Sequence, residues 1–278
     1  YFIKLLFLFP LNTGILRVQQ RWKKDSTILI IQYFFNMKNL FLALTILTSM
    51  AVSAQIIVIQ PVEVPAEMTE KFLDVELNYS KKIAQDAVNK GELEGWAVLR
   101  NTNPAADGYN YLWVNVYKDI ATAVNKGSWW NNAKEVVGVE TSMLYGFLND
   151  LKMDQRYYYK QDLMIESIAA ASYVIFNFTN STEVEKHTQE LEQYVVPHFK
   201  KMMPKSGMVG WGLSSKITPQ GDDFATMMVY DSYDSLENAM IHLSGGGPIA
   251  GLPHEKISTI EWSMRPLLEV VVSTGPKK

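Results

Sequence analysis

Apolar and polar residues follow two different periods along residues 55–278, and the changes of period mark the expected elements. A β-rich run at 56–62 predicts a strand. From Thr69 to Lys90 the apolar residues recur at helical spacing, which predicts an amphipathic helix. The chain then continues with strands at 93–100 and 109–117, a turn between them that contains Asn103-Pro104 and Asp107-Gly108, a helix from Asp119 and a strand near 163–166.

The second half repeats this order. A shift of 115 residues aligns nine identical residues within 45 positions and places Gly95-Trp96 on Gly210-Trp211; average composition would give about three identities. Past Val114 a slip of one residue restores the agreement. The second half is expected to hold strands at 173–178, 208–215, 224–230 and 261–272, with helices at 185–203 and 235–243. We therefore predict two ferredoxin-like βαββαβ modules, at 55–168 and 169–278.

Such a module covers one face of its sheet with helices and leaves the other bare, so two modules are expected to pack sheet to sheet. On the strand at 109–117 the even positions are aliphatic and are expected to face the helices. The odd positions are mostly aromatic and are expected between the sheets. The predicted ligand-binding residues are Tyr109, Tyr111, Trp113, Asn115 and Tyr117, with Phe224, Met228 and Tyr230 from the second half. They predict a cavity for an apolar or aromatic small molecule, with a filled inter-sheet core as the alternative.

The segment Lys90-Gly91-Glu92-Leu93-Glu94-Gly95-Trp96, echoed at 205–211, adds a resemblance over about residues 55–275. Here the chain resembles the dimeric α+β barrel superfamily in its form with two fused modules, especially exported proteins of unknown role with a KG-x-x-x-GW segment. The resemblance implies an α+β fold, a pseudo-dimeric barrel of tandem ferredoxin-like modules. It also implies a cavity that some members use for cofactor-free oxygenation, haem breakdown or dechlorination. It does not imply one chemistry.

Residues 37–54 have the pattern of a secretory signal peptide. Lys38 precedes an apolar run from Leu40 to Leu47, which is shorter than the ~20 residues that cross a bilayer. Cleavage is expected after Ala54, with export to a bacterial periplasm or the medium and no membrane span afterwards. Residues 1–36 are expected to be a non-native upstream translation; the alternative is an additional membrane segment.

Composition limits the classes of partner and of chemistry that are expected for this protein. Residues 55–278 hold 20 Lys and Arg against 28 Asp and Glu, a net charge of −8, which disfavours nucleic acid as a partner. The absence of cysteine excludes disulfides and thiolate chemistry. Because no metal-binding spacing or nucleophile motif occurs, neither a metal nor a cofactor is predicted. Fused modules cover their own sheets, so a monomer or a homodimer is expected.

All four histidines lie in the second half, where each is expected to be a surface or capping residue. The superfamily resemblance makes His198 and His242 the candidates for a polar group near the cavity. Three functions remain open: an exported small-molecule-binding protein, which we favour; a cofactor-independent oxygenase-like enzyme that uses Asn115, Trp113 and a histidine; and a structural or interaction protein of the cell envelope.

Overall fold

The computed structural model describes residues 55–105, 108–218 and 225–277, which belong to one compact unit of the chain. The predicted signal peptide at 37–54, the segment 1–36 and the candidate Phe224 lie outside the described residues.

Nine strands of the described chain form one antiparallel sheet in the order β3-β2-β9-β6-β8-β7-β5-β1-β4. Because β3 also pairs with β1, the sheet closes on itself as a barrel, with the short β4 attached to β1. The strands are β1 (Ile56–Glu63), β2 (Gly95–Asn101), β3 (Tyr111–Tyr117), β4 (Lys152–Met153), β5 (Tyr157–Ile165), β6 (Tyr173–Thr179), β7 (Met208–Lys216), β8 (Met227–Tyr233) and β9 (Leu267–Ser273). The halves are joined by two antiparallel pairings, β2 with β9 and β5 with β7. The predicted α+β barrel is confirmed at this level, while the division into tandem ferredoxin-like modules stays a prediction.

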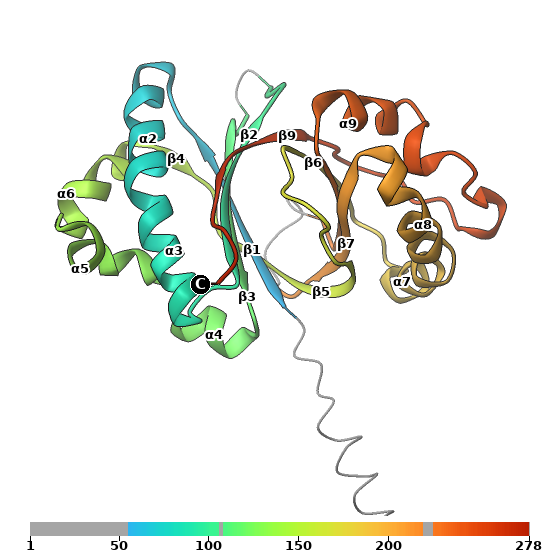
Figure 1. Cartoon of the computed structure of the whole chain (residues 1–278), viewed down its shortest axis with the longest axis horizontal. Helices are drawn as coiled ribbons and strands as arrows, with labels where there is room; N and C mark the ends of the chain where they lie inside the picture. Colours follow the sequence, from blue (N-terminus) through green and yellow to red (C-terminus); the bar gives the residue numbers. More distant parts are fainter. Residues whose placement is uncertain (1–54, 106–107, 219–224, 278) are drawn as a thin grey trace, which may run out of the picture. The chain divides into compact units, whose positions relative to one another are not determined.

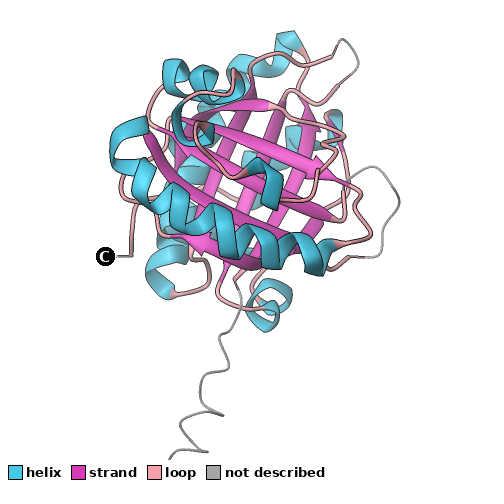
Figure 2. Cartoon of the chain, turned by 90° about the vertical axis from the view of Figure 1, so that its right-hand side faces the viewer, coloured by secondary structure: helices cyan, strands magenta, loops and turns pink. Residues whose placement is uncertain are grey.

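Helices lie outside the barrel strands, those of the first half on one side and those of the second half on the other (Figures 1 and 2). The α-helices are α2 (Thr69–Val75), α3 (Lys81–Lys90), α4 (Ile120–Asn125), α5 (Ala133–Val137), α6 (Thr141–Tyr145), α7 (Val184–Glu190), α8 (Val196–Ser206) and α9 (Leu236–Leu243). Short 3₁₀ turns accompany them: η1 (Ala66–Met68), η3 (Trp129–Asn132), η4 (Gly146–Asp150), η6 (Gly247–Ile249) and η7 (His254–Lys256).

Both long helices contain a π-helical turn at the same place. In the first half α2 runs through η2 (Glu76–Ser80) into α3, and in the second half α7 runs through η5 (Leu191–Val195) into α8. The helix expected at 69–90 is therefore present with an extra residue in its middle. A π turn widens the helix locally and rotates the residues that follow, and such turns often occur at functional sites.

The strand β3 presents its faces the opposite way from the prediction. Tyr111 and Tyr117 belong to the core beneath the first-half helices, where the Phe72 ring lies 4.9 Å from that of Tyr111. Leu112 and Val114 instead point into the barrel. Alternation defines two faces of a strand but not what each face meets. Other strands supply aromatic rings to the barrel interior, such as Tyr159 of β5 and Phe178 of β6, so β3 can turn its aliphatic face inward and its rings toward the helices.

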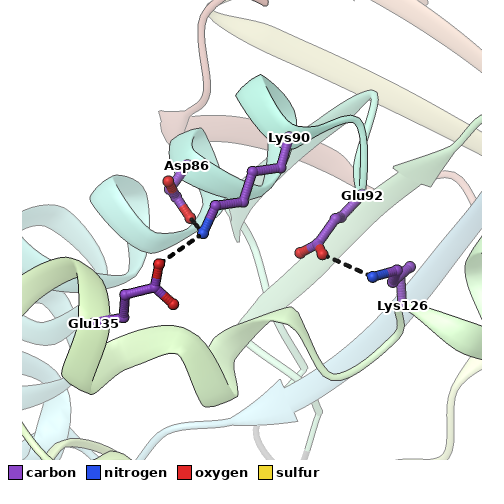
Figure 3. A network of polar contacts seen from close by, with 5 residues as sticks. All are labelled: Asp86, Lys90, Glu92, Lys126 and Glu135. Carbon is purple, nitrogen blue, oxygen red and sulfur yellow. Dashed lines mark hydrogen bonds and ion pairs between the residues drawn. The ribbon is translucent and has the colours of Figure 1, made fainter.

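A set of surface ion pairs attaches the segment after β3 to the long helix (Figure 3). Lys90 Nζ lies 2.8 Å from Asp86 and 3.3 Å from Glu135 of α5. Lys126, which follows α4, pairs with Glu92 at 2.9 Å. Exposed pairs of this kind contribute little energy each. They nevertheless hold the segment that includes η3 against α3, and η3 supplies two tryptophans to the site described next.

Candidate functional site

A cavity of about 320 Å³ lies between the outer face of the first-half strands and the helices that cover them. We call it the tryptophan pocket. It is lined by Gln60, Glu76, Ser80, Trp96, Trp113, Asn115, Trp129, Trp130, Thr141, Tyr145, Leu148, Asn149, Met153 and Arg156. Its size suits a small organic molecule, and its walls combine flat aromatic surface with a few polar groups, as in many ligand sites.

Glu76 is the acid of this pocket. It occupies the first position of the π turn η2, and only 2% of its surface is exposed. The indole N–H of Trp113 donates a hydrogen bond to its Oε1 at 3.1 Å. Burial raises the pKa of Glu76 from its ordinary 4.5 to about 7, although the hydrogen bonds from Trp113 and Ser80 oppose the rise. Near neutral pH both forms of this carboxyl group are therefore populated, and the ionised form can accept a proton.

The π turn also brings Ser80 to the pocket. Its hydroxyl lies 3.1 Å from the hydroxyl of Tyr145, which α6 supplies. Burial raises the pKa of Tyr145 above its ordinary value, so this phenol stays neutral and can donate a hydrogen bond. Glu76 and Ser80 thus place a proton acceptor and a hydroxyl pair on one wall.

Four tryptophans and one arginine build the other walls. The rings of Trp96 and Trp129 lie 6.0 Å apart, and the indole N–H of Trp129 donates to Asn115 Oδ1 at 2.9 Å. The Arg156 guanidinium lies 4.7 Å from the centre of the Trp130 ring, a cation–π contact. Its Nε donates to Gln60 Oε1 at 3.1 Å. The pocket therefore offers stacking surfaces and a fixed positive charge together with Glu76.

The predicted residues of the first half separate into two groups. Trp113 and Asn115 line the tryptophan pocket, on the helix side of the sheet rather than inside the barrel. Tyr111 and Tyr117 are buried packing residues beneath the helices. Tyr109 precedes β3 and has the Lys152 ammonium 5.7 Å from its ring centre. The predicted position of this aromatic group between the sheets is therefore wrong.

The expected cavity between the sheets does exist, inside the barrel. It has a volume of about 750 Å³, and its walls are mainly aliphatic, with Val114, Val116 and Val174 among them. Met228 and Tyr230 line it as predicted, and Tyr230 accepts a hydrogen bond from Gln161 at 2.6 Å. The Tyr230 ring covers Gly212, where any side chain would collide with it. Because β3 turns its aliphatic face inward, the two halves of the predicted ligand set lie in different cavities.

His198 and His242 both lie away from the tryptophan pocket. The His198 ring contacts the carbonyl oxygen of Pro248 at 3.0 Å and so attaches α8 to the turn η6. His242 was expected at the surface or as a cap, but only 3% of it is exposed. It lies 3.6 Å from the buried Asp231, in a second cavity taken up below. Neither histidine can act with Trp113 or Asn115 on one ligand.

Sequence reasoning missed Glu76, Trp129 and Arg156. Glu76 left a signal, because it falls on the apolar face of the predicted helix between Phe72 and Ile83, where an acid is out of place. Trp129 is the buried first residue of η3, where it packs as well as lining the pocket. Arg156 left no local signal, because it reaches the site only through the pairing of β5 with β1.

No family model matches the chain, and no curated protein matches it. Solved structures do. The crystal structure of a "putative monooxygenase" from Lactobacillus acidophilus has a TM-score of 0.56 at 12% identity, covering 81% of this chain and 97% of that one. A "putative monooxygenase" from Fusobacterium nucleatum has a TM-score of 0.53 at 12% identity, covering 81% of this chain and 99% of that one. The chain has an α+β barrel fold. At this identity the likeness extends to the fold alone.

Residues 55–105, 108–218 and 225–277 contain no cluster of three or more His, Asp or Glu side chains that could hold a metal ion. Nor does any helix within those residues have the length and apolar character needed to span a membrane.

Proposed function

We propose that the protein binds a small planar organic molecule with an acidic hydroxyl group in the tryptophan pocket, and that Glu76 accepts its proton. The observation that carries this proposal is the buried Glu76 carboxyl, which meets a tryptophan-lined cavity and has a pKa of about 7. The indole faces offer stacking surface for a ring. The Arg156 guanidinium supplies the positive charge that stabilises the resulting anion.

Oxygenation is the reaction class that we propose for the bound anion. The fold neighbours described as "putative monooxygenase" favour it over simple storage of the ligand. Loss of a proton makes an aromatic ligand electron-rich, so that dioxygen can oxidise a ring CH₂ group to a carbonyl. One oxygen atom then enters the product and the other leaves as water. In this scheme the enzyme uses Asn115 and Trp113, as the oxygenase-like alternative expects, while Glu76 takes the place of the histidine.

The tandem ferredoxin-like organisation and the export of the protein belong to the same proposal. Each half contributes four barrel strands with a long helix between the first and second, which supports two modules. The signal-peptide pattern at 37–54 supports a site of action outside the cytoplasm.

Binding of 4-nitrophenol tests the proposal, because its phenolate absorbs in the visible and tryptophan fluorescence reports its arrival. The wild type is expected to bind it and to raise the phenolate fraction above that in free solution at the same pH. Glu76→Gln should bind without that increase, whereas Glu135→Gln, an exposed acid of α5, should behave as wild type. An equal phenolate increase in Glu76→Gln would refute the role of this residue.

Oxygenation is tested separately with an oxygen electrode and a panel of hydroxylated aromatic ketones that contain a ring CH₂ group. Oxygen uptake that depends on the ketone and falls at least about 100-fold in Glu76→Gln is expected, since general-base groups contribute roughly 10²–10⁴-fold. Binding of 4-nitrophenol without oxygen uptake from any ketone would leave a binding protein and overturn the enzymatic part.

A further inference from the structure

The second half contains a cavity at the position that the tryptophan pocket occupies in the first. It also measures about 320 Å³ and lies between the outer face of the strands and the second-half helices. The ends of the π turn, Leu191 and Val195, line it as Glu76 and Ser80 line the first pocket. The strand pairing corresponds too, since Trp211 pairs with Asp231 as Trp96 pairs with Asn115. We call this cavity the second pocket.

The two pockets differ in their chemistry. Where the first has the carboxyl of Glu76 and the hydroxyl of Ser80, the second has aliphatic Leu191 and Val195. Apolar side chains from α8, β7 and the chain after α9 complete the walls, with Phe199, Trp211 and Ile257 among them. The second pocket therefore favours an apolar ligand body, and the acid of its π turn, Glu192, does not line it as Glu76 lines the first pocket.

One polar arrangement is nevertheless kept in both pockets. Arg265 Nε donates to Asn177 Oδ1 at 2.7 Å, as Arg156 Nε donates to Gln60 Oε1 at 3.1 Å. Asn177 belongs to β6 and Gln60 to β1, and these residues occupy matching places opposite β8 and β3. Among the described residues no hydrogen bond engages the terminal nitrogens of Arg265. A guanidinium is thus held in one orientation at an apolar cavity.

Buried groups beneath the cavity fix this arginine. Asn177 is 2% exposed and donates from Nδ2 to Asp231 Oδ2 at 2.6 Å. Asp231 in turn lies 3.6 Å from His242 Nε2. Burial raises the pKa of Asp231 and lowers that of His242, and the nearby Arg265 charge favours the ionised aspartate. Asp231 is engaged by Asn177 and lies beside His242, whose buried Nδ1 has no hydrogen-bond partner among the described residues. The exposed Arg265 guanidinium is the charged group that can meet a ligand at the mouth of the cavity.

We propose that the second pocket is a binding site for an apolar molecule that carries a carboxylate. The apolar body occupies the cavity between Leu191, Phe199 and Trp211. The carboxylate pairs at the mouth with the terminal nitrogens of Arg265, in the two-pronged geometry that guanidinium groups favour. This site is independent of the proton chemistry proposed for the tryptophan pocket.

Calorimetric titration of the full chain with octanoate and with 1-octanol tests the proposal, because the two probes share one chain and differ in the head group. Octanoate is expected to bind the wild type at least about tenfold more tightly, the factor that a hydrogen-bonded charged group supplies. Arg265→Gln should reduce this preference to about twofold or less. The matched variant Arg156→Gln, in the equivalent place of the other pocket, should keep the wild-type preference.

A second variant controls for folding and location. Val195→Phe fills the second pocket and should abolish binding of both probes, while circular dichroism stays that of the wild type. The proposal is overturned if Arg265→Gln keeps the preference for octanoate, or if Arg156→Gln is the variant that loses it. Glu76→Gln should leave octanoate binding unchanged, so a failure of the function proposed for the tryptophan pocket would be seen separately.

Discussion

At the scale of single residues, burial of the Glu76 carboxyl both lowers the stability of the protein above its pKa and gives the tryptophan pocket its proton acceptor. A carboxyl group removed from water resists ionisation, so the folded protein holds its proton up to a pKa of about 7, whereas the unfolded chain releases it near 4.5. Between these values the folded state binds more protons than the unfolded state. The free energy of unfolding therefore falls as pH rises through this window. Such a residue is kept for its chemistry rather than for stability.

The stability of Glu76→Gln follows from this linkage. The amide still accepts the Trp113 hydrogen bond but has no charge to bury. At pH 8 we expect the variant to unfold with a free energy up to about 3 kcal/mol higher than the wild type, and at pH 4 the two should agree. Urea denaturation at both pH values measures the difference. If the free energies of unfolding of the wild type and of Glu76→Gln depend on pH in the same way, Glu76 has the same pKa in the folded and unfolded protein and the prediction is wrong. Glu135→Gln is the control at an exposed acid.

At the scale of elements, the π turns η2 and η5 determine which side chains meet the cavities. Each turn presents its first and last residue to the pocket, as Glu76 and Ser80 or as Leu191 and Val195. Each long helix then ends at a glycine in the left-handed conformation, Gly91 with φ 73° and Gly207 with φ 66°. A residue with a side chain is strained in this conformation, so each helix ends at its glycine. The strand that carries the Gly-Trp pair follows, β2 from Gly95 and β7 from Met208.

The N-cap of α9, Ser235, allows the contribution of a helix cap to stability to be measured. The Ser235 hydroxyl accepts from the Asn238 backbone N–H at 3.3 Å, and α9 packs against β6 and β8. Ser235→Ala is expected to lower the free energy of unfolding by about 1 kcal/mol, the usual value of an N-cap. Ser235→Asn, which can cap in the same way, should lose much less. Urea denaturation compares the two, and equal losses would exclude capping as the cause.

At the scale of the whole described unit, the closed barrel makes each half depend on the other. The edge strands β2 and β5 of the first half find their partners in β9 and β7 of the second. An open sheet would expose the unpaired backbone groups of those edges. Because the pairing strands also enclose one interior cluster, we expect the two halves to unfold together.

Leu268→Ala tests this cooperativity. Leu268 is fully buried in the barrel and pairs with Asn101 of the first half and Val174 of the second. Removal of its side chain should lower the free energy of unfolding by about 2–5 kcal/mol. Tryptophan fluorescence, which reports mainly on the first half, and far-ultraviolet circular dichroism should follow one shared transition. Separate transitions would show that the halves are stable alone.

Much of the architecture was available from the sequence. The strands at 56–62, 109–117 and 173–178 and the helix at 235–243 were placed within two or three residues of their observed bounds, and the Gly-Trp pairs marked equivalent strands. The strand expected at 224–230 lies at Met227–Tyr233. The observed bounds are those of β3 moved by 116 residues, which agrees with the one-residue slip in the repeat, because Tyr117 and Tyr233 occupy equal places, opposite Ile56 and Tyr173.

The sequence by itself determined the period of each segment, because helical and extended backbones impose their spacing on the apolar residues locally. Only the tertiary structure decided that the aromatic face of β3 meets helices, that Glu76 accepts a hydrogen bond from Trp113, and that Arg156 lines the same pocket through its hydrogen bond to Gln60. These contacts join residues 37 or more positions apart. They depend on barrel closure and strand register, which arise from pairing between distant segments and leave no periodic trace in any one of them.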